Sequence, residues 1–170
     1  MSADIYVMGT SHPLQCGRAD LPKGIVASFE SELRRVLKKY RIKRVAEEMS
    51  LDGLKEEEVS ETVAQRMARK LKIAYQAIDL TKEERAGLSL NDSTLFQVMR
   101  SFKIEDGGPL QQGFDDLADG IRERIWIARI LAGSQWPVFL ICGSEHAVSV
   151  RRLWRCMGFA SKLVHLDYEP

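Results

Sequence analysis

The chain of 170 residues is long enough to bury a hydrophobic core, and we expect a single domain over residues 1–170. Its 25 lysines and arginines nearly balance its 24 aspartates and glutamates, which argues against a global attraction to nucleic acid or membranes. No apolar run reaches the roughly 18 residues of a membrane span, and no leader segment is recognisable, so a cytoplasmic protein is expected.

The first half of the chain alternates between apolar runs and amphipathic segments. Ile5–Met8 predicts a buried strand, and a helix with one apolar face follows from about Asp20. Ile42–Met49 predicts a second strand. Residues 55–72 place acids first and bases last, with apolar residues every four positions, which predicts one helix. Ile73–Leu80 predicts a third strand.

The second half continues the same alternation after an irregular region. Thr81 and Glu84 form a capping-box pattern that predicts a short helix. Residues 87–120 contain scattered turn residues and predict a partly helical insertion, a candidate lid. A long helix is predicted at Asp115–Leu131. The last predicted elements are a strand, a helix and a strand, at Pro137–Cys142, Glu145–Met157 and Ser161–Leu166. This order predicts an α/β fold with a largely parallel central sheet of about five strands, flanked by helices.

One local charge imbalance stands out. From Arg34 to Arg44 the chain has seven basic residues and no acid. Cations at the end of a helix complement its dipole, which is the favoured interpretation. The other interpretation is a surface for nucleic acid or another anionic partner, but no glycine and only one aromatic residue, Tyr40, are interleaved to support it.

Two distant strands end in the same short motif. The run "VMGTSH" ends at His12, and "ICGSEH" ends at His146. In an open parallel sheet ligands bind at the carboxyl ends of the strands, and glycine there permits a tight turn or a close backbone approach. We therefore expect the two imidazoles to meet at one edge of the sheet. The third histidine, His165, is interpreted as structural.

Acidic and basic candidates accompany the histidines. Glu47 and Glu48 end the second predicted strand, and adjacent residues of an extended strand face opposite sides, so one of them faces the site. The alternative is that both pair with the preceding Lys43 and Arg44. On the long helix, Arg122 and Glu123 interrupt an apolar run. They form either a buried structural ion pair or an anion clamp with its orienting carboxylate.

Taken in order, "IYVMGTSH", a strand-end glutamate, "IRERIW" and "VFLICGSEH" resemble the TraB/PrgY and Tiki (GumN-like) proteins. The likeness to the erythromycin-esterase-like and haem-binding ChaN-like proteins is looser. The resemblance assigns His12 and His146 to the motif histidines and Glu47 or Glu48 to the motif carboxylate. It assigns Arg122-Glu123 to an Arg–acid pair. The Tiki branch implies metal-dependent proteolysis, and the esterase branch implies hydrolysis by His and Glu without a required metal.

The leading hypothesis is a small soluble hydrolase, peptidase- or esterase-like, acting on a small-molecule or peptide substrate. Its candidate catalytic side chains are Glu47, Glu48, Arg122 and Glu123. A divalent metal (Mn, Co or Zn) is expected on His12, His146 and Glu48, unless these groups act directly as acids and bases. Arg122 would stabilise an oxyanion or anchor an anionic group.

Two hypotheses compete with the hydrolase. One is a non-catalytic module that binds a metal, nucleotide or small anion in the same cleft, as a sensor or immunity-type partner. The other is an interaction protein in which the stretch from Arg34 to Arg44 matters and the histidines do not. Imidazoles that point apart and pack against apolar side chains would argue against every hypothesis that needs the cleft. A homo-oligomer is also expected; membrane and nucleic-acid partners are not.

Overall fold

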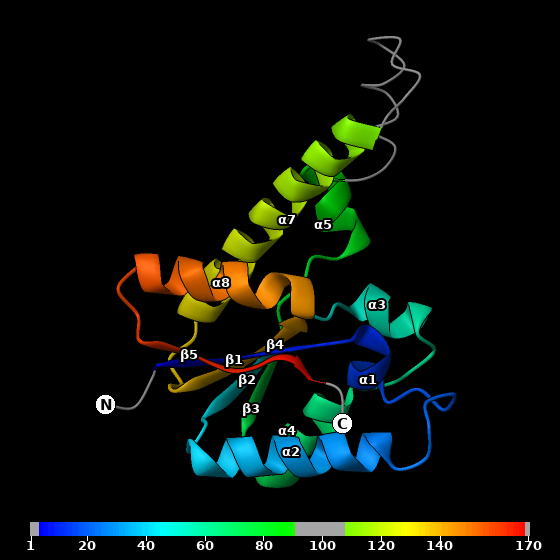
Figure 1. Cartoon of the computed structure of the whole chain (residues 1–170), viewed down its shortest axis with the longest axis vertical. Coiled ribbons are helices and arrows are strands. Elements are labelled where there is room, and N and C mark those ends of the chain that lie inside the picture. Colours follow the sequence, from blue (N-terminus) through cyan, green and yellow to red (C-terminus); the bar gives the residue numbers. More distant parts are fainter. Residues whose placement is uncertain (1–3, 91–107, 169–170) are drawn as a thin grey trace.

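The computed structural model describes residues 4–90 and 108–168, which are organised around one sheet (Figure 1). The strands are β1 (Ile5–Thr10), β2 (Arg44–Glu47), β3 (Ala74–Ala77), β4 (Val138–Gly143) and β5 (Ser161–Tyr168). All five pair in parallel, in the order β3-β2-β4-β1-β5. The predicted α/β fold with a parallel sheet of about five strands is confirmed.

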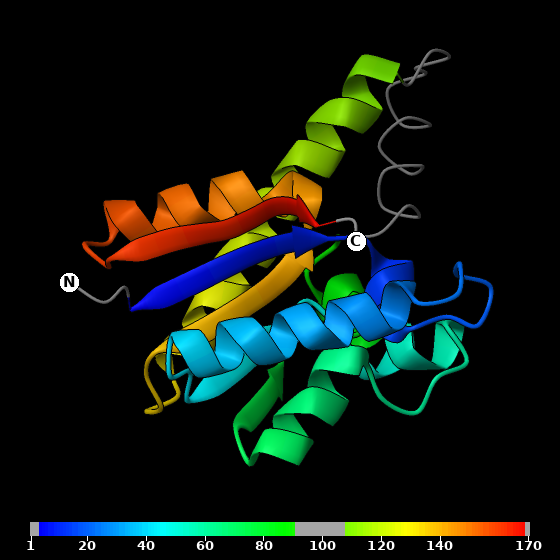
Figure 2. The same ribbon diagram turned by 60° about the horizontal axis from the view of Figure 1, so that its bottom comes forward.

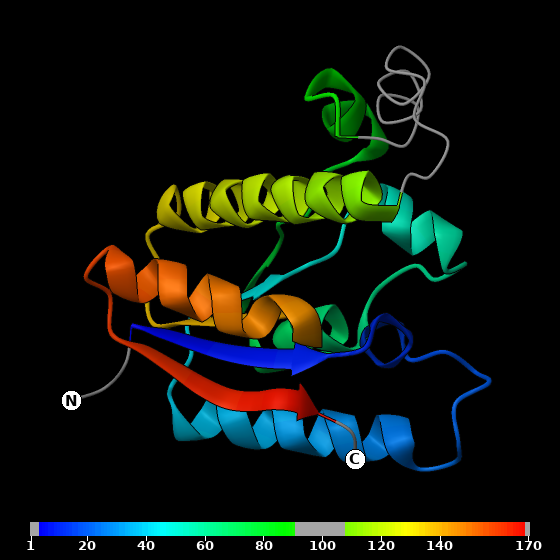
Figure 3. The ribbon, with the colours of Figure 1, turned by 45° about the horizontal axis from the view of Figure 1, so that its top comes forward.

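Helices cover both faces of the sheet, as Figures 2 and 3 show. The helices before β4 are α1 (His12–Cys16), α2 (Ile25–Lys39), α3 (Leu51–Glu56), α4 (Val63–Leu71), α5 (Lys82–Gly87) and α7 (Gly108–Leu131). Helix α8 (Ser144–Cys156) follows β4. Helices α2 and α4 pack on one face, and α7 and α8 pack on the other. Within the described residues, no helix combines the length and hydropathy needed to cross a membrane.

Each central strand supplies two hydrophobic cores because successive side chains point to opposite faces. Tyr6 and Met8 of β1 pack with the apolar faces of α2 and α4. Ile5 and Val7 pack with α7 and α8. Strands buried on both faces have continuous apolar sequences rather than alternating ones, which is why β1 and β4 were recognisable from the sequence.

The chain leaves neighbouring strands β1 and β4 toward opposite faces of the sheet. After β1 it enters α1 and then α2, and after β4 it enters α8. A divergence of this kind opens a crevice at the carboxyl ends of the strands, where ligands of open α/β sheets bind. The two Gly-x-x-His motifs therefore lie on either side of this divergence.

Glycine is required at residue 9 by a close backbone approach. A Cβ atom there would lie 1.9 Å from the carbonyl oxygen of Leu166 and 2.9 Å from the Cα of Ser144. The pairing of β1 with β5 is irregular at this point, between Met8 and Thr10. At Gly143 the nearest atom to an added Cβ is instead the flexible end of Glu145, at 2.4 Å.

The prediction of a single helix over residues 55–72 is wrong. The chain forms α3 and α4 there, separated by a turn in which Glu58 has a φ of 55°. Thr62 caps the second helix, with its hydroxyl accepting a hydrogen bond from the Gln65 amide at 3.0 Å. Spacing of apolar residues did not reveal this cap, because a threonine inside an acidic-to-basic stretch fits either arrangement.

The region predicted as an insertion, 87–120, is partly regular. The capping box of Thr81 and Glu84 is present at the start of α5. Helix α7 begins at Gly108 rather than at Asp115, and Pro109 is compatible with a first turn because its missing N–H would have no helical partner. Residues 91–107, the middle of the candidate lid, lie outside the described residues.

Candidate functional site

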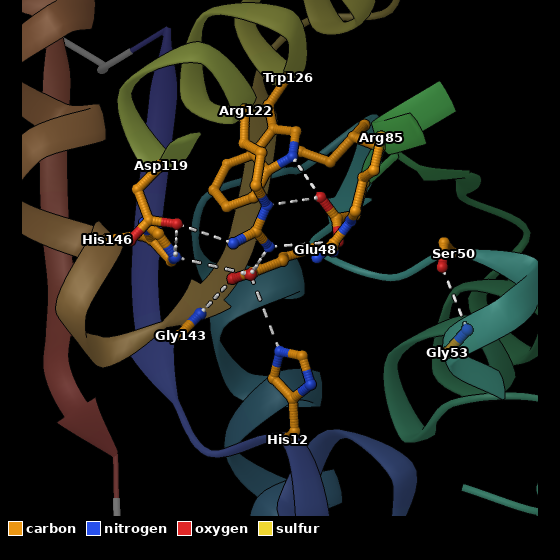
Figure 4. Close-up of polar contacts among 12 residues, drawn as sticks. His12, Glu48, Ser50, Gly53, Arg85, Asp119, Arg122, Trp126, Gly143 and His146 are labelled. Atoms are coloured by element: carbon orange, nitrogen blue, oxygen red, sulfur yellow. Dashed lines mark hydrogen bonds and ion pairs between the residues drawn. The ribbon is translucent and has the colours of Figure 1, made fainter. Parts of the chain in front are cut away.

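Ionisable side chains from four strand ends gather at the carboxyl edge of the sheet (Figure 4). His12 begins α1, separated from the end of β1 by one residue, and His146 lies in the first turn of α8 after β4. Glu48 follows β2, and Asp79 follows β3. Arg122 reaches them from α7. We call these five residues the carboxyl-edge cluster.

Glu48 is the centre of the cluster and is only 2% exposed. Its Oε1 accepts a hydrogen bond from Arg122 Nη2 at 2.7 Å, and its Oε2 accepts one from the Gly143 amide at 2.6 Å. Burial raises the pKa of Glu48, but the polar contact with His12 and the charges of His146 and Arg122 outweigh it and lower the pKa overall. Glu48 is therefore an ionised carboxylate held in the protein interior.

Both motif histidines approach the same oxygen. The distance from Glu48 Oε1 is 3.8 Å to His12 Nε2 and 3.7 Å to His146 Nε2. Each gap is longer than a good hydrogen bond and short enough for an ion pair. The two imidazoles thus converge at one edge of the sheet, as expected.

The two imidazoles differ in their surroundings. The contact with Glu48 raises the pKa of His12, whose side chain is 46% exposed. His146 is buried against the edge of Trp126, with ring centroids 5.0 Å apart. Burial lowers the pKa of His146, but its hydrogen bond with Glu123 and the charge of Glu48 raise it overall. His12 is thus the histidine that solvent reaches.

Glu123 holds the His146 ring. Its Oε1 lies 3.0 Å from His146 Nδ1 and also accepts the hydroxyl proton of Ser149. In the neutral ring this contact keeps the proton on Nδ1 and leaves the Nε2 lone pair facing Glu48. Glu123 is therefore a partner of His146 and not of the adjacent Arg122.

Arg122 is committed to three carboxylates. Nε and Nη2 each lie 3.2 Å from an oxygen of Asp79, Nη1 lies 2.9 Å from Asp119, and Nη2 also donates to Glu48. Burial lowers the pKa of Arg122, but the charges of Asp79 and Glu48 outweigh it and raise the pKa. All three guanidinium nitrogens are engaged by these carboxylates, so Arg122 is neither ion-paired with Glu123 nor an open anion clamp.

Glu47 does not join the cluster. It points to the opposite face of the sheet, where its Oε2 accepts hydrogen bonds from Thr62 at 2.5 Å and Tyr75 at 2.8 Å. Burial raises the pKa of Glu47 to about 7. Glu47 was predicted as a candidate catalytic group, but strand pleating turns its side chain away from Glu48. Arg44, the alternative partner of both acids, instead donates to the carbonyl of Ile130 at 2.5 Å.

Sequence reasoning missed two carboxylates of this site. Asp79 accepts hydrogen bonds from Trp126 Nε1 at 2.9 Å and from Arg85 at 2.5 Å, in addition to Arg122. It follows β3 just as Glu48 follows β2, so the strand-end rule would have found it. Asp119 lies three residues before Arg122 on α7, a spacing at which helical side chains meet.

A cleft of about 160 Å³ opens beside the cluster. His12, Glu48 and Asp79 line it, together with acids of the α3 segment: Asp52, Glu56 and Glu57. Lys82 and Arg85 are the cations on its walls. Each of the five carboxylates on its walls is ion-paired, so the cleft is lined by paired charges rather than by free negative charge.

The predicted metal ligands do not fit a metal in this arrangement. The Oε1 of Glu48, which would bind the ion, is already paired with Arg122, and a guanidinium competes with a metal cation for the same oxygen. Among residues 4–90 and 108–168, no group of three or more His, Cys, Asp and Glu side chains is spaced to hold a metal ion. A metal on His12, His146 and Glu48 stays a prediction, and the mechanism that we propose does not use one.

Comparisons with known proteins do not identify the chain. No family model matches it, and neither a curated protein nor a solved structure is significantly similar. The resemblance to the TraB/PrgY and Tiki proteins thus stays a prediction from short motifs.

Proposed function

We propose that the protein is a small hydrolase, peptidase- or esterase-like, in which His12 and Glu48 activate water at the carboxyl edge. The observation that carries the proposal is the half-exposed His12 imidazole beside a buried, ionised Glu48 on the wall of a cleft. An imidazole oriented by a carboxylate is a recurrent general base.

The base in this proposal is Nδ1 of His12. Its Nε2 is directed at Glu48, so the neutral ring carries its proton there, and Nδ1 is the nitrogen left to accept one. Figure 4 shows the second ring nitrogen turned away from Glu48. A water attacking an acyl carbon would lose its proton to Nδ1, and the imidazolium would return that proton to the leaving alcohol or amine. Glu48 would stabilise the imidazolium between these steps.

The other cluster residues act through Glu48. Arg122 and the Gly143 amide hold its carboxylate, and His146 places a second imidazole 3.7 Å from the same oxygen. These are positioning residues. Arg85 lines the cleft and donates to Asp79, so we propose it, rather than Arg122, as the cation facing an oxyanion.

The test is turnover of ester and peptide panels with and without a chelator. We expect wild-type activity to survive chelation, and His12→Ala to lose about 10²–10⁴-fold in kcat/KM, the usual contribution of a general base. His165→Ala is the matched control, because His165 pairs with Glu32 and has no part in the mechanism. Activity that appears only with added Mn, Co or Zn would replace this mechanism with the metal-dependent one.

The pH dependence separates a positioning role for Glu48 from a merely structural one. His12 must be neutral to act as base and its pKa is raised, so the rate should rise with pH through a value above the ordinary 6.5. In Glu48→Gln the main cause of that shift is gone. We expect the rising limb of the kcat/KM profile to move to lower pH while the plateau falls. An unmoved limb would contradict the assignment.

The alternative function is a non-catalytic module that binds a ligand in the same cleft. Its walls carry both acids and the cations Lys82 and Arg85, so a metal, a nucleotide and a small anion are each tested as the ligand. Isothermal titration with divalent cations and with phosphate distinguishes these, and binding without turnover would support this alternative.

We also propose a cytoplasmic location. Cys16, Cys142 and Cys156 are all free, as is usual in a reducing compartment. A homo-oligomer stays a prediction, which sedimentation analysis would test.

A further inference from the structure

A large basic hollow lies at the amino edge of the sheet, opposite the carboxyl-edge cluster. It measures about 1010 Å³ and lies where α2 and α8 end and β5 begins, on the left side of Figure 1. Its cationic lining residues come from three elements and their flanks: Lys39, Arg41, Lys43, Arg151, Arg155 and Lys162. No aspartate or glutamate is among the residues that line it.

Two smaller hollows extend this surface. One, of about 360 Å³, shares Arg41 and Lys43 with the large hollow and adds Lys38 and Lys72. The other, of about 420 Å³, shares Arg151 and Arg155 and adds Arg152. Neither has an acidic residue in its lining. We call the joined surface of the three hollows the basic edge.

The cations of the basic edge are not neutralised by the fold. None of the six in the large hollow forms an ion pair with the part of the chain that the structure describes. The Nε of Arg151 is buried without a hydrogen-bond partner there. The nearby Asp4 carboxylate accepts a hydrogen bond from the Ala160 amide at 3.0 Å. This surface therefore keeps a large local positive charge in a nearly neutral protein.

Helix dipoles do not account for this collection of charges. Cations at the ends of α2 and α8 complement those dipoles, as expected for Lys39 and Arg155. Lys162, however, belongs to a strand, and Lys43 precedes one. Arg151 lies more than a turn before the end of its helix. Mutual repulsion among these groups costs stability, which points to an anionic partner that offsets it.

We propose that the basic edge binds the phosphate backbone of a nucleic acid. Continuity over three hollows fits a chain of phosphates better than a single phosphate group. The aromatic rings present are partly covered: Tyr40 stacks on Tyr6 at 4.2 Å, and Phe159 stacks on Trp136 at 5.6 Å. Lys39 and Lys162 lie 5.4 and 5.0 Å from the Tyr40 ring centre. The recognition is thus of phosphates, with little reading of bases.

This inference is independent of the hydrolase proposal, because no residue of the carboxyl-edge cluster takes part. It differs from the expectation that nucleic acid is not a partner, which rested on the near balance of acids and bases and on the interpretation of the stretch from Arg34 to Arg44 as a helix end. A net charge does not reveal that cations without ion-pair partners among the described residues gather at one edge of the molecule.

The test is fluorescence anisotropy with labelled single strands and duplexes of about 20 nucleotides, in DNA and RNA, over a range of salt. About six phosphate contacts predict a loss of affinity of about 10³-fold between about 50 and 200 mM salt. The edge variant is Lys39→Gln/Arg155→Gln/Lys162→Gln. Its slope of log K against log salt should fall by about 2–3, with at least about tenfold weaker binding at low salt.

A matched control removes the same charge elsewhere. Lys23→Gln/Lys55→Gln/Arg124→Gln alters three exposed cations that line none of the three hollows, and it should bind like wild type. Thermal melts of both variants establish that they fold. The proposal is overturned if no nucleic acid binds at about 10⁻⁴ M protein and low salt, the weak end of non-specific binding. It is also overturned if both variants weaken equally, or if inorganic polyphosphate binds and nucleic acid does not.

Discussion

The two edges of the sheet differ in whether their charged side chains have partners within the chain. At the carboxyl edge, Glu48 and Asp79 are buried, and both accept hydrogen bonds from Arg122, whose side chain is 12% exposed. At the amino edge, six cations line one hollow, and no carboxylate is among its lining residues. Buried charges require partners at hydrogen-bonding distance, whereas exposed ones are tolerated by solvent. The charges of the carboxyl edge are thus satisfied within the chain, and those of the amino edge are the ones that we propose a partner satisfies.

The largest expected effect comes from removing the shared cation of the carboxyl edge. Arg122→Met leaves Glu48 and Asp79 buried without their main counter-charge and should cost about 3–5 kcal/mol in free energy of unfolding. Urea denaturation measures this. Arg85→Met, which removes a half-exposed partner of Asp79, should cost under about 1 kcal/mol. Equal losses would show that burial does not distinguish these two arginines.

A second effect concerns pH and the acid that faces away from the cluster. The folded-state pKa of Glu47 is raised from 4.5 to about 7, so the folded chain holds this proton more tightly than the unfolded chain. Its stabilising contribution is complete below pH 4.5 and is lost as pH rises through about 7. The loss is about 3 kcal/mol.

Glu47→Gln removes this titration and keeps an amide oxygen for Thr62 and Tyr75. The difference in unfolding free energy between variant and wild type should therefore shift in favour of the variant between pH 5 and pH 8. Thermal melts across that range follow it. Parallel curves for the two proteins would mean that Glu47 titrates normally.

The smallest effect is expected at the amino edge. Lys39→Gln/Arg155→Gln/Lys162→Gln removes repulsion among like charges and a favourable helix-end interaction together. The unfolding free energy should change by about 0.5 kcal/mol or less, and less still at high salt. Chemical denaturation at two salt concentrations checks this. A loss of unfolding free energy as large as that of Arg122→Met would show that these cations stabilise the fold, and the contrast between the two edges would then not hold.

Much of the fold could be predicted from the sequence because apolar runs and helical periodicity are local signals. The strand-end rule also found His12, Glu48 and His146. It did not choose between Glu47 and Glu48, since that choice depends on which face α7 covers. Helical periodicity missed the division of residues 55–72 between α3 and α4. The Thr62 hydroxyl there both caps α4 and donates a hydrogen bond to Glu47.

The charge contrast could be predicted from the sequence only in part, because the basic stretch from Arg34 to Arg44 supplies Lys39, Arg41 and Lys43 but not the cations of α8 and β5. Lys39, Arg155 and Lys162 are far apart in the chain, and only the parallel topology brings the ends of α2 and α8 to the start of β5. Arg122 likewise stands next to Glu123 in sequence but pairs with Glu48 and Asp79 of other elements, and with Asp119 one turn earlier on α7. Neighbours in sequence were a poor guide to ionic partners in both regions.

The glycines of the two Gly-x-x-His motifs are alike in sequence and unequal in tolerance to substitution. At residue 9 any side chain collides with the backbone of Leu166, and at residue 143 it meets only the movable end of Glu145. A saturation library should accept alanine or serine at 143 far more often than at 9. The tolerance to substitution that such a library measures at these two glycines would thus reflect how closely β1 and β5 approach, and it would carry no information about catalysis.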